Sequence, residues 1–333
     1  NPNAPEVRGY VMLMMQRADE GAGTPEVCQT PENVLSCSLG LDTCPAECVT
    51  NEVKAGDLSL SLASGTPASM TSIPQNGIVN FAVVDFKAQS EDIKVNSVTV
   101  TRQGLGQRAD ISRIYFERNG MRVSGRASLS TDNTAVISFS PALIVKKNST
   151  ETLDLVVNVV AATAGGEHAF KVTNVNSSAA SSSFNITTPT LRTSNYQVGE
   201  VVFDDLGSAQ SVRAGEANVE LGQFKLTNTS TDNKELQVKA VTFRQNESAD
   251  LKNLSNLAIY RDGDKVSTDV VVNGKEVTFA LNNKLTDGQS SIYYIRGTVD
   301  FVDNAGEKYQ FNLRNAEDLN VAEYTTMFRA AVK

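Results

Sequence analysis

Tryptophan is absent from this chain, and histidine occurs only once, at position 168. Aromatic residues make up just 6% of the composition. Because platforms for sugars and bases rely on exposed aromatic faces, this composition argues against a stacking platform for carbohydrate. A single histidine also excludes transition-metal sites that are rich in histidine.

Positive charge and long apolar runs are scarce as well. The 333 residues include 30 Lys and Arg against 38 Asp and Glu, a net charge of -8. Nucleic acid and anionic lipid require basic surfaces, so neither is expected as a main partner. No run approaches the ~20 apolar residues of a membrane helix, so we expect a chain that does not span a membrane. The start at Asn1, without an initiator Met, is consistent with removal of a signal peptide.

Cysteine is rare but tightly grouped, with the spacing C-x8-C-x6-C-x3-C. The four residues are Cys28, Cys37, Cys44 and Cys48. An even, clustered set predicts two disulfides in one small loop, and the spacing leaves all three connectivities open. Structural zinc is the alternative, but only the last two cysteines have the short spacing of a zinc-binding pair. Disulfides imply an oxidising compartment, so we expect a secreted protein, extracellular or at the cell surface.

The chain contains an internal repeat. IKVNSVTVTRQ (93–103) matches LQVKAVTFRQ (236–245), and further segments match at a nearly constant offset. Each copy has the size of an ordinary domain. We therefore expect an N-terminal extension (1–54), a first module (55–188), a linker (189–195) and a second module (196–333).

Both copies have the pattern of short strands. Apolar and polar residues alternate with a period of two, and a phase change within 236–243 predicts a β-bulge. Short helical turns are expected at 108–113 and 249–256, each capped by an aspartate. Hairpin turns are indicated by the dipeptides Asn119-Gly120, Asp262-Gly263 and Asn273-Gly274. Together these features predict an all-β chain with two tandem immunoglobulin-like β-sandwich domains.

Catalytic motifs are missing from the sequence. It has no G-x-S-x-G elbow, P-loop or H-E-x-x-H motif. His168 is replaced by Lys308 at the matching position of the second copy, which favours a structural loop residue over a catalytic base. We therefore do not expect an enzyme.

Two kinds of surface site remain as candidates. Asp204 and Asp205 follow the linker and could bind calcium, which prefers oxygen ligands; the alternative is a pair of solvated turn carboxylates, and no other cofactor is expected. N-x-S/T triplets, which are glycan acceptors in eukaryotic secreted proteins, begin at Asn148, Asn176, Asn185, Asn228, Asn246 and Asn253. In a chain rich in Asn, Ser and Thr, several such triplets arise by chance.

An apolar run near the N-terminus lies outside the repeat. It comprises Tyr10, Val11, Met12, Leu13, Met14 and Met15. As a strand it would be apolar on both faces, which suits a strand buried on both sides. It could be the first strand of its own sandwich. Alternatively, it could be donated head-to-tail to a neighbouring subunit, which would produce a filament.

The repeat and strand pattern over 53–333 resemble secreted prokaryotic cell-surface proteins built from tandem immunoglobulin-like modules, such as surface-layer proteins and strand-exchange filament subunits. The resemblance implies a self-assembling structural role, with other copies of the chain as partners. The alternative is a monomeric adhesin or binding module, with a glycan as candidate ligand.

Overall fold

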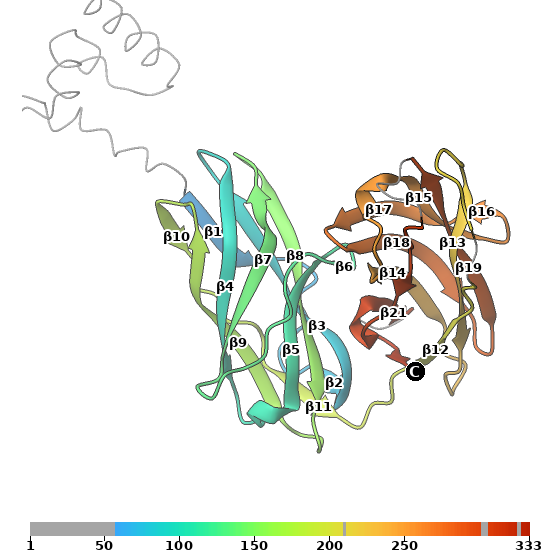
Figure 1. Ribbon diagram of the computed structural model, residues 1–333. Helices are drawn as coiled ribbons and strands as arrows, with labels where there is room; N and C mark the ends of the chain where they lie inside the picture. The colour runs from blue at the N-terminus through green and yellow to red at the C-terminus, as the bar shows by residue number, and fades with distance from the viewer. Residues whose placement is uncertain (1–56, 209–210, 301–305, 325–327) are drawn as a thin grey trace, which may run out of the picture.

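The computed structural model describes residues 57–208, 211–300, 306–324 and 328–333 (Figure 1). These residues form strands and short 3₁₀ turns arranged in several sheets. The architecture is all-β, as expected for β-sandwich domains. We refer to residues 57–194 as the first half and to residues 200–333 as the second half.

The first half contains two sheets. Their strand orders are β10-β1-β3-β8-β5-β6 and β2-β11-β9-β4-β7. The elements are β1 (Asp57–Leu62), β2 (Ser72–Pro74), β3 (Asn76–Ala88), β4 (Ile93–Gln103), η2 (Arg108–Asp110), β5 (Ile111–Arg118), β6 (Met121–Arg122), β7 (Thr134–Val145), β8 (Thr150–Val160), β9 (Glu167–Ser177), β10 (Ser181–Ser183) and β11 (Leu191–Ser194).

The second half repeats this plan. Its sheets have the orders β16-β15-β19-β13-β12-β22 and β17-β18-β14-β20, with β21 also paired to β14. The elements are β12 (Glu200–Asp205), β13 (Val219–Asn228), β14 (Leu236–Gln245), η3 (Leu251–Asn253), β15 (Leu254–Arg261), β16 (Asp264–Lys265), β17 (Ser267–Asn273), β18 (Glu276–Leu285), β19 (Ser290–Val299), β20 (Phe311–Asn312), η4 (Ala316–Asp318), β21 (Leu319–Glu323) and β22 (Ala331–Val332). In both halves the first strand also pairs in parallel with the sheet's last element, β10 or β22. The first sheet thus has equivalent strand orders in the two halves.

Each half has its own apolar core, to which both of its sheets contribute. In the first core Phe81 and Phe170 meet edge to face, with ring centroids 5.0 Å apart. In the second core Phe224 stacks on Tyr293 at the same separation, 5.0 Å. The period-2 alternation in the sequence produces these cores, because every second side chain of a strand points to the same face.

The predicted hairpin turns are present, with one change. Asn119 and Gly120 have φ of 51° and 80°, and Asp262 and Gly263 have φ of 53° and 92°, as a type I′ turn requires. Each of these dipeptides forms the two-residue loop between two paired strands. The third hairpin is shifted by one residue.

In that third hairpin Asn273 pairs with Glu276, so the loop is Gly274–Lys275 rather than Asn273–Gly274. Gly274 has φ of 59° and occupies the first central position, as in a type II′ turn. The glycine therefore selects the turn, and the preceding asparagine remains a strand residue.

The expected bulge and helical turns are confirmed. The register of β14 shifts between Val238 and Ala240. The side chain of Asp250 caps η3 by accepting from the N–H of Lys252, while Asp110 caps η2 from within the turn. Part of the predicted linker, 189–195, lies in a strand instead. Residues 191–194 form β11, which pairs with β9 and β2 of the first half.

Candidate functional site

The two halves meet where the end of the chain returns to the first half. Phe328 forms an antiparallel bridge with Val79 of β3, and the N–H of Arg329 donates to the carbonyl of Ile78 at 3.1 Å. Phe328 also packs against the apolar core of the first half. Its ring lies 5.2 Å from that of Tyr196, in the connecting segment. Backbone pairing and apolar contact therefore both join the halves.

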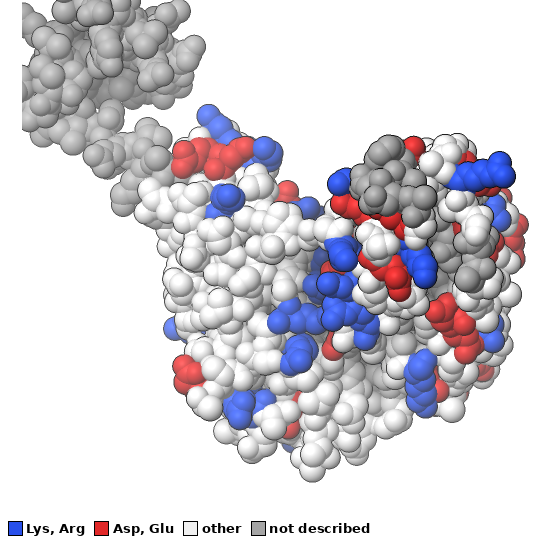
Figure 2. All heavy atoms as spheres, in the orientation of Figure 1, with Lys and Arg blue, Asp and Glu red and all other residues white. Residues whose placement is uncertain are grey.

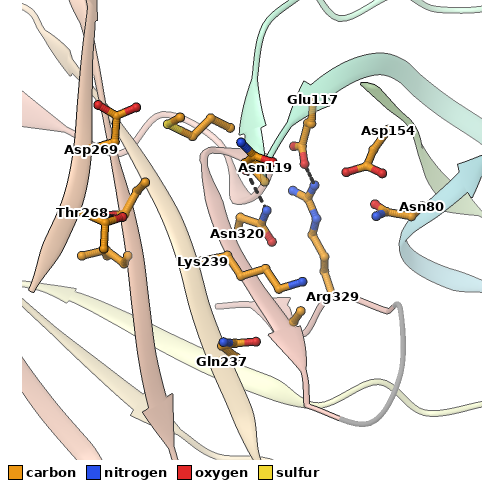
Figure 3. A pocket seen from close by; sticks show the side chains of 15 residues that line it. Asn80, Glu117, Asn119, Asp154, Gln237, Lys239, Thr268, Asp269, Asn320 and Arg329 are labelled. Carbon is orange, nitrogen blue, oxygen red and sulfur yellow. Dashed lines mark hydrogen bonds and ion pairs between the residues drawn. The ribbon is translucent and has the colours of Figure 1, made fainter. Parts of the chain in front are cut away.

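A buried ion pair lies at the centre of this junction. The Arg329 guanidinium donates to the Glu117 carboxylate of β5, and the two residues are only 4% and 2% exposed (Figure 3). Burial lowers the pKa of Arg329, but the charge and hydrogen bond of Glu117, together with the charges of Tyr115 and Asp154, raise it by more, so the net direction is upward. Nearby, burial raises the pKa of the Tyr115 phenol. Tyr115, Ile78 and Val156 form a small apolar cluster separate from the two main cores.

A second group of ion pairs lies along the β5–β6 hairpin. Arg122 Nη2 is 3.1 Å from Glu276 Oε2 and 3.7 Å from Asp318 Oδ1. Arg126 also pairs with Asp318 Oδ1. Asp318 is held in place because its other oxygen accepts from the N–H of Asn315 at 3.2 Å, which caps η4. Arginines of the first half are thus paired with carboxylates of the second.

The tip of the β5–β6 hairpin packs against the second half. Asn320 Nδ2 donates to the carbonyl of Gly120 at 2.7 Å. A Cβ at Gly120 would lie 2.8 Å from that same Nδ2 atom. At the equivalent Gly263, a Cβ would meet no atom within 4 Å. The same turn thus occurs in both copies, but only the first copy uses it as a contact between halves.

A polar cavity of about 530 Å³ lies between the halves (Figure 3). Asn80, Glu117 and Asp154 line it from the first half, whereas Lys239 and Arg329 line it from the second. Glu117 and Asp154 are directly opposite each other on β5 and β8. Burial raises the pKa of Asp154, and the negative charge of Glu117 raises it further. Arg329 therefore offsets the repulsion of two adjacent carboxylates.

His168 has a different environment from the one expected. It is fully buried in β9 rather than exposed on a loop. Its Nδ1 is 3.2 Å from Arg102 Nη1, and its Nε2 is 3.3 Å from Asp110 Oδ2. Burial, followed by the charge of Arg102, lowers the pKa of His168. Gly106 makes room for the ring, because a Cβ there would lie 2.2 Å from His168 Cε1.

The candidate calcium ligands make ordinary strand contacts. Asp204 pairs with Lys225 at 2.9 Å, and Asp205 Oδ1 accepts from the N–H of Gly207 at 2.9 Å. Adjacent strand residues point to opposite faces, so their carboxylates do not converge. Over the described ranges, no group of three or more His, Cys, Asp or Glu residues could hold a metal ion.

Two of the candidate glycosylation sites are inaccessible in the fold. Asn228 is fully buried, and its Nδ2 donates to the carbonyls of Lys234 and Leu285. Asn253 is buried in η3. Burial of these two side chains disfavours glycan attachment to the folded chain at Asn228 and Asn253, and glycosylation at all six positions stays a prediction. The other four asparagines, Asn148, Asn176, Asn185 and Asn246, are exposed.

The apolar run at 10–15 and the four cysteines lie outside the described residues, so their strand and disulfide assignments stay predictions. Among the described residues, no helix is long and apolar enough to cross a membrane. The junction was missed by sequence analysis. Its one visible signal is the concentration of arginine in β5 and β6 and the segments beside them.

Comparisons with known proteins give no family. No family model matches the chain, and no curated protein matches it. A non-cellulosomal cohesin from Archaeoglobus fulgidus is similar at 14% identity, over 42% of this chain and 91% of the cohesin, with a TM-score of 0.25. The B domain of a biofilm-associated protein is similar at 8% identity, over 74% of this chain and 73% of that one, with a TM-score of 0.23.

A third similar chain comes from a structure described as manganese lipoxygenase of Gaeumannomyces graminis with a partial zonadhesin of Komagataella pastoris. It is 9% identical over 84% of this chain and 98% of that one, with a TM-score of 0.17. At these identities and TM-scores, none of the three assigns a function to this chain.

Proposed function

We propose that the chain is a structural subunit of a self-assembling extracellular filament or surface layer, in which the apolar strand at 10–15 is donated to a neighbouring subunit. The observation that carries the proposal is the junction. A subunit that transmits tension along a filament needs domains that keep a fixed orientation, and backbone pairing together with the buried Glu117–Arg329 pair supplies such a connection.

An accepting edge is also available in the second half. β17 is the last strand in the order of its sheet, and its Val271 and Val272 are each 46% exposed. An exposed, β-branched edge strand is a template for pairing with a strand from another chain. The apolar strand of a neighbour would cover these two valines and satisfy the backbone groups beside them.

Sedimentation velocity over a range of concentrations tests this function. We expect the full chain to form polymers whose size grows with concentration, and the chain lacking residues 1–16 to remain monomeric. The matched control is Leu105→Lys, which removes an apolar side chain that is 85% exposed elsewhere in the first half and should leave assembly unchanged. A truncated chain that still polymerises would refute strand donation, and a full chain that stays monomeric would refute self-assembly.

A further inference from the structure

A second hollow lies at the edge of the junction, lined by three arginines. It has a volume of about 440 Å³. The lining residues are Ser112, Arg113, Arg126, Arg314, Asn315 and Glu317. Figure 2 shows Lys and Arg side chains gathered in the groove between the two halves, around β5 and β6. Because the lining comes from both halves, the site exists only when the junction is formed.

Positive charge is concentrated here against the overall charge of the chain. The whole chain has a net charge of -8, whereas residues 57–194 carry twelve Lys and Arg against ten Asp and Glu. Two of those twelve, Arg113 and Arg126, line the hollow together with Arg314 of the second half. The lining carries three arginines against one carboxylate, Glu317, and such an excess of positive charge raises the local concentration of anionic ligands.

The arginines of the hollow keep donors available for a ligand. Arg113 is exposed and uses Nη1 to donate to the Ser112 carbonyl at 3.0 Å and to Ser128 Oγ. Arg314 is exposed and has no hydrogen-bond or ion-pair partner in the described part of the chain. Arg126 pairs through Nη2 with Asp318, and its Nε is buried without a partner. Guanidinium groups bind carboxylate, sulfate and phosphate through paired hydrogen bonds.

The hollow also contains acceptors, which narrows the ligand class. Glu317 presents a carboxylate, of which Oε1 accepts from Asn158 Nδ2 at 2.7 Å. Ser112 Oγ donates to the Asn158 carbonyl at 3.2 Å and so offers its lone pairs to the hollow. The internal phosphates of a polyphosphate chain have no hydroxyl to donate to these groups, and Glu317 repels their charge. An acidic sugar carries its anionic group next to several hydroxyls, so it can accept from the arginines and donate to Glu317 and Ser112.

We propose that this hollow binds an acidic polysaccharide, with Arg113 and Arg314 contacting the carboxylate or sulfate group and Glu317 accepting from neighbouring hydroxyls. The site is independent of polymerisation, since it lies within one chain. In an extracellular subunit it would attach the protein to an anionic glycan of a surface or matrix.

Isothermal titration calorimetry on the full chain tests the proposal. The ligands are polygalacturonate for carboxylate, heparin for sulfate, dextran as a neutral polysaccharide and polyphosphate as an anion without ring hydroxyls. We expect polygalacturonate or heparin to bind, dextran not to bind, and polyphosphate to bind at least about tenfold more weakly than the better acidic polysaccharide. The acidic polysaccharide that binds with the higher affinity shows whether the site prefers a carboxylate or a sulfate group.

Three variants locate the site. Arg113→Gln combined with Arg314→Gln should weaken binding by about tenfold or more, because it removes two charge-assisted contacts. Arg213→Gln, an exposed arginine of the second half, is the matched control and should change the affinity less than about twofold. Glu317→Gln should strengthen polyphosphate binding, because it removes the repelling charge. Circular dichroism melts verify that each variant is folded.

The proposal is overturned if neither acidic polysaccharide binds, if dextran binds equally well, or if polyphosphate binds as tightly as both. It is also overturned if the double arginine variant keeps the affinity of the unchanged protein.

Discussion

Replacing Glu117 with glutamine removes one charge of the buried pair and leaves Arg329 charged in the interior. The two residues are 2% and 4% exposed, so bulk solvent has little access to the guanidinium. Breaking a buried ion pair by removing one partner costs about 3–5 kcal/mol. The same strand supplies a matched control, because Arg118 pairs with Glu151 at 2.7 Å with side chains 40% and 27% exposed. Glu151→Gln should cost about 1 kcal/mol or less.

Urea unfolding followed by far-UV circular dichroism measures both costs. We expect a decrease in the unfolding free energy of Glu117→Gln that is several times larger than that of Glu151→Gln. Glu117→Leu combined with Arg329→Met should recover most of the loss, because a buried ion pair can often be replaced by apolar side chains without loss of stability. Equal, small costs for the two glutamine variants would show that Glu117 and Arg329 are not a buried pair.

Two further predictions concern the hairpin and the cavity. Gly120→Ala and Gly263→Ala both place alanine at a positive φ, which costs about 1–2 kcal/mol of unfolding free energy each. Only the alanine at 120 would overlap a neighbouring atom, so thermal unfolding should show a further loss of about 1–3 kcal/mol for Gly120→Ala. Equal losses for the two variants would contradict the contact between the halves. The raised pKa of Asp154 means that the folded chain holds this proton more tightly than the unfolded chain, so the charged carboxylate costs stability above the raised pKa. Asp154→Asn should therefore unfold at a higher urea concentration than the unchanged protein at pH 7. This gain in stability should disappear as the pH falls below 3.8, the ordinary pKa of an aspartate carboxyl. A gain that does not depend on pH would contradict the prediction.

The local features of the fold could be predicted from the sequence because they depend on neighbouring residues. Asn119-Gly120 and Asp262-Gly263 determine their turns through their own backbone preferences. The period-2 pattern likewise determines which side chains of a strand are buried. In the third hairpin, which is shifted by one residue, the glycine at position 274 still lies in the turn.

The junction could not be predicted, because it depends on contacts between distant parts of the chain. Glu117 and Arg329 are 212 residues apart, and nothing in either local sequence indicates the other. The burial of Asn228 has the same cause, because its side chain donates to the carbonyl of Leu285 in a strand that follows much later. His168 was placed on a loop by comparison with Lys308, but a buried ring needs the space that Gly106 provides.

The claim that supports the proposed function is that the two halves have one fixed orientation. Amide residual dipolar couplings of the full chain in a dilute aligning medium test it directly. We predict that a single alignment tensor fits the amides of residues 57–194 and 200–300 together. Two tensors that differ in magnitude or direction would show that the halves reorient independently, and would contradict the role of the junction.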